Sequence, residues 1–327
     1  MSVTVLKPGL LTSLQDGGRP GHAALGIGRA GAMDEPARRL ANALVGNEEH
    51  EAALEFTLLG PTLRFERAAV IALTGGECGA RAGDWPLPLW TCCLLPAGSV
   101  LQLGGMRRGC RGYLAVRGGF DAPPVLGSRS TDLHARLGPL DGRALQAGDR
   151  LAVGPPSRGP SPRGLRAPHA LRWSLDPRPW LDDGETPLAL LRGHHFDALD
   201  DASRQRLFTA RFTVSKDSNR TASRLDGQRL ALRQPLELVS EATLPGTVQL
   251  PPSGQPIVLQ AEAPVTGGYP RVGQLAAADL PRLAQRRPGD AVCFRECTLA
   301  EAVERLARRQ QRLQRLLHHI ARRLESA

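Results

Sequence analysis

Residues 12–47 read TSLQDGGRPGHAALGIGRAGAMDEPARRLANALVGN and join a glycine-rich loop to a short helix signal. Glycine has no Cβ, so a backbone this rich in it suits turns and close approach more than core building. Asp34 is a favourable N-cap, Pro36 falls in the first turn, and Gly46 lies just past the expected end. The stretch therefore predicts one short capped helix after the loop. The apolar residues that this helix would bury are Leu40, Leu44 and Val45.

Short apolar runs separated by Gly, Pro and Asp turns dominate the rest of the chain. This pattern is typical of a barrel or sandwich, so the sequence predicts a mainly β fold with few helices. A second short helix is expected to start at Asp279 and to stop before Pro288. The expected strands cover residues 2–5, 54–58, 70–73, 100–103, 113–116, 188–191, 211–214, 257–260 and 291–294.

Two halves of the chain resemble each other on either side of a proline-rich segment. Residues 155–168, PPSRGPSPRGLRAP, have no apolar periodicity and are the expected linker. The echoes are GPTLRF at 60 with GQRLAL at 227, VRGGF at 116 with VTGGY at 265, and AGDRLAV at 147 with PGDAVCF at 288. We therefore predict a duplicated β-barrel, with one domain over residues 1–154 and the other over residues 169–297.

The last segment, residues 298–327, carries a different signal. Thr298 followed by Glu301 is a capping box, and apolar residues recur after it at helical spacing. A helix of about 27 residues would be ~40 Å long, more than a barrel needs for closure. It either lies on its own domain with a solvated arginine face or docks another subunit. The apolar stripe is Val303, Leu306, Leu313, Leu316, Leu317, Ile320 and Leu324.

Composition excludes several classes of protein. The net charge is +10, yet only Lys7 and Lys216 are lysines and aromatic residues make up 4% of the chain, which disfavours a nucleic-acid surface. The six cysteines have no zinc or redox spacing and are expected to be reduced, buried thiols. No signal-peptide pattern opens the chain, and prolines and a glycine break its most apolar stretch. We expect a cytoplasmic protein that contacts no membrane.

Several catalytic motifs are missing. Neither lysine follows a glycine, so there is no Walker-type ATP site, and there is no GxSxG serine elbow. GIGRAG at 26–31 matches GxGxxG, but no strand leads into it and Asp34 would repel a pyrophosphate. No lysine stands between methionines, as a biotin attachment site requires. We therefore expect this chain itself to hold no cofactor.

The remaining chemistry is a set of donors suited to small carboxylates or amides. Arginines in turns can address a carboxylate with two parallel hydrogen bonds. Nearby aspartates either orient the arginines or act as a base. The arginines are Arg19, Arg129 and Arg220, the neutral neighbours are Ser128, Ser218 and Asn219, and the acids are Asp16 and Asp132.

Residues 246–273, GTVQLPPSGQPIVLQAEAPVTGGYPRVG, set further donors among Gly and Pro beside one apolar strand. Pro256 fixes the backbone after Gln255, and Tyr269 lies between Gly268 and Pro270. Preorganised donors of this kind stabilise an oxygen that gains negative charge. Together with residues 12–47, this block predicts one cleft with two walls. The run Gly193-His-His-Phe-Asp197 offers too few ligands for a metal, so no metal is expected.

Eight motifs in order resemble the biotin-dependent carboxyltransferase family, which includes the C subunit of 5-oxoprolinase, allophanate hydrolase subunit 2 and the carboxyltransferase part of urea carboxylase. The resemblance covers nearly the whole chain and implies two tandem cyclophilin-like barrels. The motifs are TSLQDGGRPG at 12, GAMD at 31, NALVGN at 42, LEFTLLGPTLRF at 54, VLGSRSTDL at 125, SNRTASRLDG at 218, PPSGQPIVL at 251 and TGGYP at 266.

The resemblance implies a component of an ATP-dependent 5-oxoprolinase that works with the A and B subunits of that enzyme on a small carboxylate or amide. It also implies that ATP is bound by a partner subunit and that biotin, if used, is carried by a partner protein. Its alternatives are the carboxyltransferase subunit of a urea-type carboxylase and a non-catalytic protein that antagonises a kinase inhibitor. Ala222 and the run Ala263-Pro264-Val265 depart from the family pattern and leave the substrate open. The implied catalytic residues are Arg220, Ser218, Asn219 and Asp132. The implied substrate-binding residues are Gln15, Asp16, Arg19, Ser128, Arg129, Gln255, Thr266, Gly267, Gly268 and Tyr269.

Overall fold

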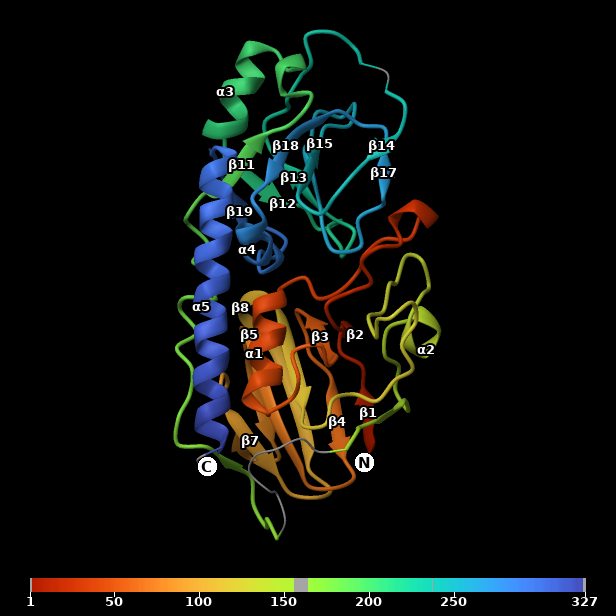
Figure 1. Ribbon diagram of the computed structural model, residues 1–327, viewed down its shortest axis with the longest axis vertical. Helices are drawn as coiled ribbons and strands as arrows, with labels where there is room; N and C mark the ends of the chain where they lie inside the picture. Colours follow the sequence, from red (N-terminus) through yellow and green to blue (C-terminus); the bar gives the residue numbers. More distant parts are fainter. Residues whose placement is uncertain (1, 156–163, 237, 326–327) are drawn as a thin grey trace. The chain divides into compact units, whose positions relative to one another are not determined.

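The computed structural model describes residues 2–155, 164–236 and 238–325 (Figure 1). The chain forms two compact units. The first contains Met1–Arg19, Asp34–Leu181 and Leu313–Ala327, and the second contains Pro20–Met33 and Asp182–Arg312. The predicted linker lies mostly outside the described residues, and the domain bounds 1–154 and 169–297 remain predictions beside this division.

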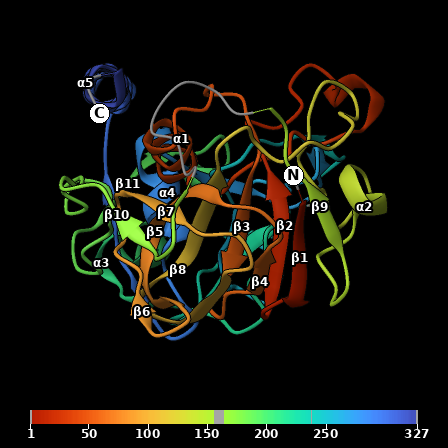
Figure 2. The same ribbon diagram turned by 90° about the horizontal axis from the view of Figure 1, so that it is seen from below.

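A ten-stranded sheet forms the first unit. Its main path runs β10 (His169–Ala170), β7 (Cys92–Leu95), β5 (Ala69–Ala82), β8 (Val100–Val116), β4 (Thr62–Phe65), β1 (Ser2–Lys7) and β9 (Arg150–Ala152). Beside this path, β3 (Ala53–Thr57) joins β8 to β2 (Leu11–Gln15), and β6 (Trp85–Pro86) pairs with β5. Figure 2 shows β1 beside β4 and β2 beside β3. β4 and β3 pair with the two ends of one edge of β8, at residues 100–102 and 111–114, while β5 pairs along its other edge. β1 and β2, which pair with β4 and β3, therefore extend the same side of the sheet.

Strands β5 and β8 are longer than predicted. Residues 100–103 and 113–116, expected as separate strands, are the two ends of the 17-residue β8. β5 pairs with β8 from Ile71 to Ala82, with register shifts between Gly75 and Ala80. Glycines allow this close pairing, since a Cβ on Gly75 would lie 2.4 Å from the Arg111 carbonyl oxygen. The glycine-rich segments that looked like turns therefore continue the ladder through bulges.

The predicted helix after the first glycine-rich loop is confirmed as α1 (Glu35–Leu44). The Asp34 side chain accepts a hydrogen bond from the Ala37 backbone N–H at 3.2 Å, and Gly46 has φ of 76° just past the end. The predicted face is fully buried, at 0% exposure for Leu40, Leu44 and Val45. In addition, the Asp34 backbone N–H donates to the Tyr113 hydroxyl, which donates to Glu55. A short helix, α2 (Pro139–Gly142), lies later in this unit.

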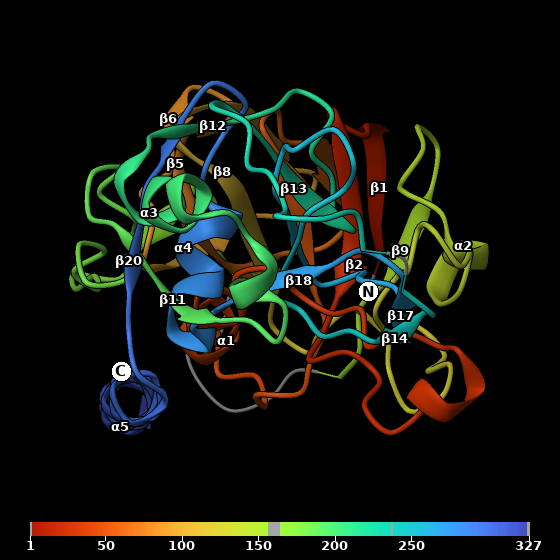
Figure 3. The same cartoon turned by 90° about the horizontal axis from the view of Figure 1, so that it is seen from above.

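An eight-stranded sheet forms the second unit. Its order is β19 (Ala291–Val292), β12 (Phe212–Val214), β13 (Ala222–Asp226), β16 (Ile257–Leu259), β15 (Thr247–Gln249), β18 (Arg271–Leu275), β11 (Leu188–Arg192) and β20 (Phe294–Glu296). Figure 3 shows β11 beside β18. Because β19 and β20 end this order but only Cys293 separates them in the chain, the sheet must curve until its edges meet. A separate pair, β14 (Glu241–Ala242) with β17 (Thr266–Gly267), belongs to the same unit.

One of the three predicted internal echoes is confirmed in backbone detail. Gly148 N–H donates to the Val5 carbonyl at 2.8 Å, and Val5 N–H donates to the Asp149 carbonyl at 2.8 Å. The second unit repeats this exchange between Gly289, Val214 and Asp290, at 2.8 and 2.9 Å. By contrast, residues 227–232 form no strand, unlike their counterpart in β4. The mainly β class, with two tandem barrels, few short helices and one long C-terminal helix, is confirmed.

Short helices line the second unit, and one long helix ends the chain. They are η1 (Ala23–Leu25), η2 (Phe196–Ala198), α3 (Asp201–Thr209), η3 (Ala277–Asp279), α4 (Leu280–Ala284) and α5 (Leu299–Glu325). The Thr298 hydroxyl accepts from Glu301 N–H at 3.2 Å, as the capping box predicts, while the Glu301 carboxylate pairs with Arg295 instead of closing the box. The predicted helix before Pro288 is confirmed as α4.

The apolar stripe of α5 is already covered within this chain. Leu313, Leu317, Ile320 and Leu324 are 1–7% exposed, and Leu313–Ala327 belongs to the first unit. Of the stripe, Val303 near the start of the helix is strongly exposed at 58%, and Leu299, which precedes the stripe, is 68% exposed. The docking-arm interpretation of this stripe is therefore wrong, because leucines that support their own fold are not available to another subunit.

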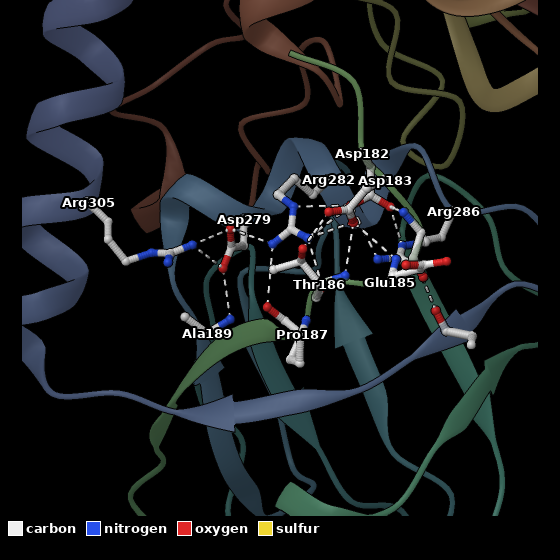
Figure 4. A network of polar contacts seen from close by, with 12 residues as sticks. Asp182, Asp183, Glu185, Thr186, Pro187, Ala189, Asp279, Arg282, Arg286 and Arg305 are labelled. Atoms are coloured by element: carbon white, nitrogen blue, oxygen red, sulfur yellow. Dashed lines mark hydrogen bonds and ion pairs between the residues drawn. The ribbon is translucent and has the colours of Figure 1, made fainter. Parts of the chain in front are cut away.

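Arginine–aspartate contacts hold the start of α5 to the second unit (Figure 4). Arg305 donates to both Asp279 carboxylate oxygens at 2.9 and 3.0 Å, and Asp279 also accepts from Ala189 N–H at 2.8 Å. Arg282 reaches Asp279 at 3.2 Å and Asp182 at 3.1 Å. Asp279 was expected to start α4, yet its side chain makes no cap. Its carboxylate instead joins strand β11, helix α4 and helix α5.

All six cysteines are free thiols, and five are buried. Burial raises the pKa of Cys92 to about 11 and that of Cys93 to about 12, so both are protonated at neutral pH. The prediction of unpaired, mostly buried cysteines is confirmed. Within the described ranges, every helix is too short or too polar to cross a membrane.

Candidate functional site

Asp16 is the centre of a buried polar cluster in the first unit. One carboxylate oxygen accepts from the Ser128 and Ser130 hydroxyls, each at 2.6 Å, and from Gly18 N–H at 2.8 Å. The other oxygen accepts from Arg129 N–H at 2.6 Å. One oxygen therefore takes three donors and the other takes one, so the charge of the carboxylate is stabilised by four hydrogen bonds. Asp16 therefore ties the end of β2 to residues 125–132, and this leaves it poorly suited to act as a base.

Two other predicted residues from the first loop are buried in the same region. Gln15 is 0% exposed, and its amide donates to Ser13 and to the Thr131 carbonyl, both at 2.9 Å. Arg19 is 1% exposed and donates to the Ser130 carbonyl. The contacts of both side chains are with the protein itself. Their substrate-binding roles stay predictions.

Arg129 and Asp132 serve the loop that carries them. The Arg129 guanidinium donates to the Ala122 carbonyl at 2.8 Å, and Asp132 accepts from His134 and Ala135 N–H at 3.1 and 2.9 Å. Asp132 is 4% exposed, so it acts as a turn cap. The structure thus brings together the predicted residues of the first unit as a folded loop core. These are Gln15, Asp16, Arg19, Ser128, Arg129 and Asp132.

In the second unit, Ser218 and Asn219 form a turn before β13. The Ser218 hydroxyl accepts from Arg224 N–H at 3.0 Å. The Asn219 side chain accepts from Thr221 and Ala222 N–H at 2.8 and 3.1 Å. Side chains that bond their own backbone in this way are typical of Asx and Ser turns. Ala222 is buried in this arrangement at 7% exposure, and its N–H fills the second acceptor site of Asn219.

Arg220 forms a buried ion pair that the sequence did not indicate. Its Nε lies 2.5 Å from Glu262 Oε1, and both side chains are 2% exposed. Its Nη2 donates to the Gly31 carbonyl at 2.7 Å. Gly31 and Glu262 come from the two glycine-rich blocks predicted to form facing walls. The blocks do meet here, within the second unit, and Arg220 holds them together.

Gly268 and Tyr269 border a pocket of about 760 Å³ in the second unit. Tyr269 is 46% exposed. The neighbouring pair Thr266–Gly267 forms β17, and Gln255 donates to the Gly227 carbonyl at 2.9 Å. Of the predicted residues, only Gly268 and Tyr269 line this pocket. Its walls are Arg229, Leu230, Ala231, Leu232, Pro235, Leu236, Leu238, Leu250, Pro251, Pro252, Ser253, Gly254 and Pro270.

Gln249 is a further polar residue that sequence reasoning missed. It is 5% exposed, and its amide nitrogen has no hydrogen-bond partner among the described residues. A Cβ on Gly267 would lie 2.4 Å from that nitrogen, so the glycine of the TGGYP motif leaves room for the amide. Gln249 follows the apolar Val248 in β15, so its side chain points to the opposite face of the strand. This alternation is the one sequence signal that could have identified Gln249.

The histidine run at 193–197 has a structural contact. His195 Nδ1 accepts from Arg271 N–H at 3.2 Å, and burial lowers the pKa of His195, with His194 and Arg271 adding to the effect. Across the described part of the chain, no group of three His, Cys, Asp or Glu residues is placed to hold a metal ion.

Comparison with known proteins gives consistent matches. The family model described as carboxyltransferase domain, subdomain A and B, matches residues 25–296. The chain is 41% identical to the C subunit of Escherichia coli 5-oxoprolinase over 325 residues, 98% of each chain. It is 38% identical to the C subunit of Haemophilus influenzae 5-oxoprolinase, covering 89% of this chain and 90% of that one. The Kluyveromyces lactis urea carboxylase superposes with a TM-score of 0.83 at 28% identity, covering 98% of this chain and 29% of that chain.

Proposed function

Since the chain belongs to the family of carboxyltransferase domains with subdomains A and B, we propose that it is the C subunit of an ATP-dependent 5-oxoprolinase. It would act with the A and B subunits to hydrolyse 5-oxoproline to glutamate. The observation that carries this proposal is the 41% identity to the Escherichia coli protein over 98% of both chains. A match over nearly all of both chains supports the same fold and the same role in the complex.

The chain's own chemistry supports a subunit that binds rather than one that phosphorylates. Opening a lactam places negative charge on the carbonyl oxygen, and ATP can lower the barrier by activating that oxygen. Neither lysine of this chain lies in a phosphate-binding loop, so the ATP step is assigned to a partner subunit. In this scheme the present chain holds the small carboxylate and orients the lactam for attack by the water that the hydrolysis consumes.

Reconstitution tests the proposal. The purified chain and the A and B subunits are assayed for 5-oxoproline-dependent ADP and glutamate, separately and in every combination. We expect turnover only when all three are present. Robust turnover by this chain alone, or turnover by the other two that is unchanged when it is added, would contradict the proposal.

A urea-type carboxyltransferase is the second candidate, favoured by the TM-score of 0.83 to urea carboxylase. The match covers 29% of that enzyme, so biotin and the carboxylase would have to come from partner proteins. The distinguishing assay supplies a biotin carboxylase, a biotinylated carrier and labelled bicarbonate. Transfer of label to urea that depends on this chain would select the second candidate over the first.

A further inference from the structure

The 760 Å³ pocket of the second unit has the dimensions of a small-molecule site. Protein ligand sites usually measure ~300–1,000 Å³ and combine apolar walls with a few polar groups. Leu230 and Leu250 form its buried floor at 3% exposure each, and prolines from the PPSG and GYP motifs form its sides. An apolar floor of this kind favours a ligand with a hydrocarbon body.

Arg229 supplies the positive charge of this pocket. Its stem packs over Gly254, where an added Cβ would lie 3.1 Å from the Arg229 Cβ. Its guanidinium makes no hydrogen bond or ion pair with any residue that the structure describes. The exposed neighbour Arg233 differs, because it pairs with Asp201 at 2.7 Å. Arg229 is therefore a cation at an apolar pocket without a carboxylate partner in the described chain.

Two hydroxyl groups complete the polar lining. Tyr269 is half-exposed, and its hydroxyl has no hydrogen-bond partner among the described residues. The Ser253 hydroxyl accepts from Gln255 N–H at 3.3 Å and keeps its own proton free to donate. Arg229, Ser253 and Tyr269 are all donors, so the pocket favours an anionic or carbonyl-bearing ligand over a cation.

We propose that this pocket binds a small monocarboxylate, with the carboxylate on Arg229 and the hydrocarbon body against Leu230 and Leu250. A planar guanidinium can bind both carboxylate oxygens at once, and removal of the leucine surface from water favours the apolar part. The choice of 5-oxoproline as one ligand rests on the proposed function. The pocket is larger than that molecule, so longer monocarboxylates also fit.

Ligand-observed NMR titration of the full chain tests this inference. The probes are 5-oxoproline, 2-pyrrolidone, which has the same ring without the carboxylate, and hexanoate, which has the carboxylate without the lactam. They are titrated into the wild type, Arg229→Gln, Tyr269→Phe and the matched control Arg233→Gln. Melting curves of all four proteins establish that each is folded.

We expect at least one carboxylate probe to bind, 2-pyrrolidone to bind far more weakly, and Arg229→Gln to weaken the carboxylate about ten-fold or more. Arg233→Gln should bind like the wild type, and Tyr269→Phe should weaken binding with no change in fold. Equal binding to wild type and Arg229→Gln, or no binding of either carboxylate, overturns the inference.

The ligand titrations and the activity assay test the pocket and the proposed function separately. Hexanoate binding that Arg229→Gln removes, without binding of 5-oxoproline, supports the monocarboxylate pocket and removes 5-oxoproline as its ligand. Full 5-oxoprolinase activity of the three-component mixture with Arg229→Gln overturns the pocket as a substrate site while the proposed function stands.

Discussion

Substitution of Glu262 by Gln should strongly destabilise the second unit. Glu262 and Arg220 are 2% exposed and 2.5 Å apart, and Arg220 also holds the Gly31 carbonyl. The amide keeps the shape of the side chain but removes the negative charge that compensates the buried guanidinium. Loss of one partner from a buried pair costs about 3–5 kcal/mol, because the remaining charge stays out of water.

The expected shift in urea denaturation is large. With a slope of about 2 kcal/mol per molar urea, 3–5 kcal/mol moves the midpoint by about 1.5–2.5 M. Far-UV circular dichroism follows the unfolding, because all four tryptophans (Trp85, Trp90, Trp173 and Trp180) lie in the first unit and their fluorescence reports on that unit. Hydrogen exchange of peptides covering residues 20–33 and 220–222 locates the loss.

The matched control is Asp201→Asn, which removes a surface partner of Arg233 in the same unit. The two side chains of that pair are 51% and 83% exposed, so the expected cost is below about 1 kcal/mol. A double variant, Arg220→Met with Glu262→Leu, should recover most of the stability lost by Glu262→Gln. If Glu262→Gln costs no more than the surface control, the buried pair does not join the two blocks as argued.

Three further changes follow from named contacts. Gly267→Ala should lower the melting temperature, since its Cβ would lie 2.4 Å from the buried Gln249 amide. Gly268→Ala is the control, because the nearest atom to its Cβ would be 3.5 Å away and its melting temperature should not change. Equal melting temperatures for the two variants would contradict this prediction. Burial lowers the pKa of folded His195 below 6.5, so the unfolded chain binds more protons than the folded chain in acid. The free energy of unfolding should therefore fall as the pH drops through 6.5. In the His195→Gln variant, that part of the curve of stability against pH should be flatter. A chain ended after Glu296 should aggregate on size-exclusion chromatography, because burial of Leu313, Leu317, Ile320 and Leu324 contributes ~1.5–3 kcal/mol each; a monomer with a cooperative melt would show that α5 is dispensable.

Local signals explain what the sequence predicted well. Asp34, Pro36 and Gly46 define α1 within a dozen residues, and Gly148 and Gly289 start equivalent turns from the same GD pattern. Each of these features depends on neighbours in the chain, so propensity and capping rules reach them. The long strands β5 and β8 were cut short in the prediction because their glycines read as turns, and only the pairing of the two strands shows that the ladder continues.

The candidate site was harder to predict because its contacts are long-range. Arg220 was assigned to catalysis on its motif, yet its partner Glu262 lies 42 positions away and closes off the guanidinium. Arg229, by contrast, lies outside the eight family motifs. Its proposed role depends on long-range neighbours, namely Gly254 beneath its stem and the leucines of the pocket. The motif residues Asp16 and Arg220 have protein contacts, whereas Arg229 and Tyr269 are exposed at the pocket.

These polar residues fall into two classes, those held by protein contacts and those exposed at the pocket. Asp16 and Arg220 make several protein contacts and are 6% and 2% exposed, so substitutions there should alter stability before they alter affinity. Arg229 and Tyr269 are exposed at the pocket, so substitutions there should alter affinity with little change in melting temperature. Measuring both quantities for Arg220→Met and Arg229→Gln separates the classes. A pocket variant that unfolds the chain, or a buried variant that only weakens ligand binding, would show that protein contacts do not distinguish structural from binding residues here.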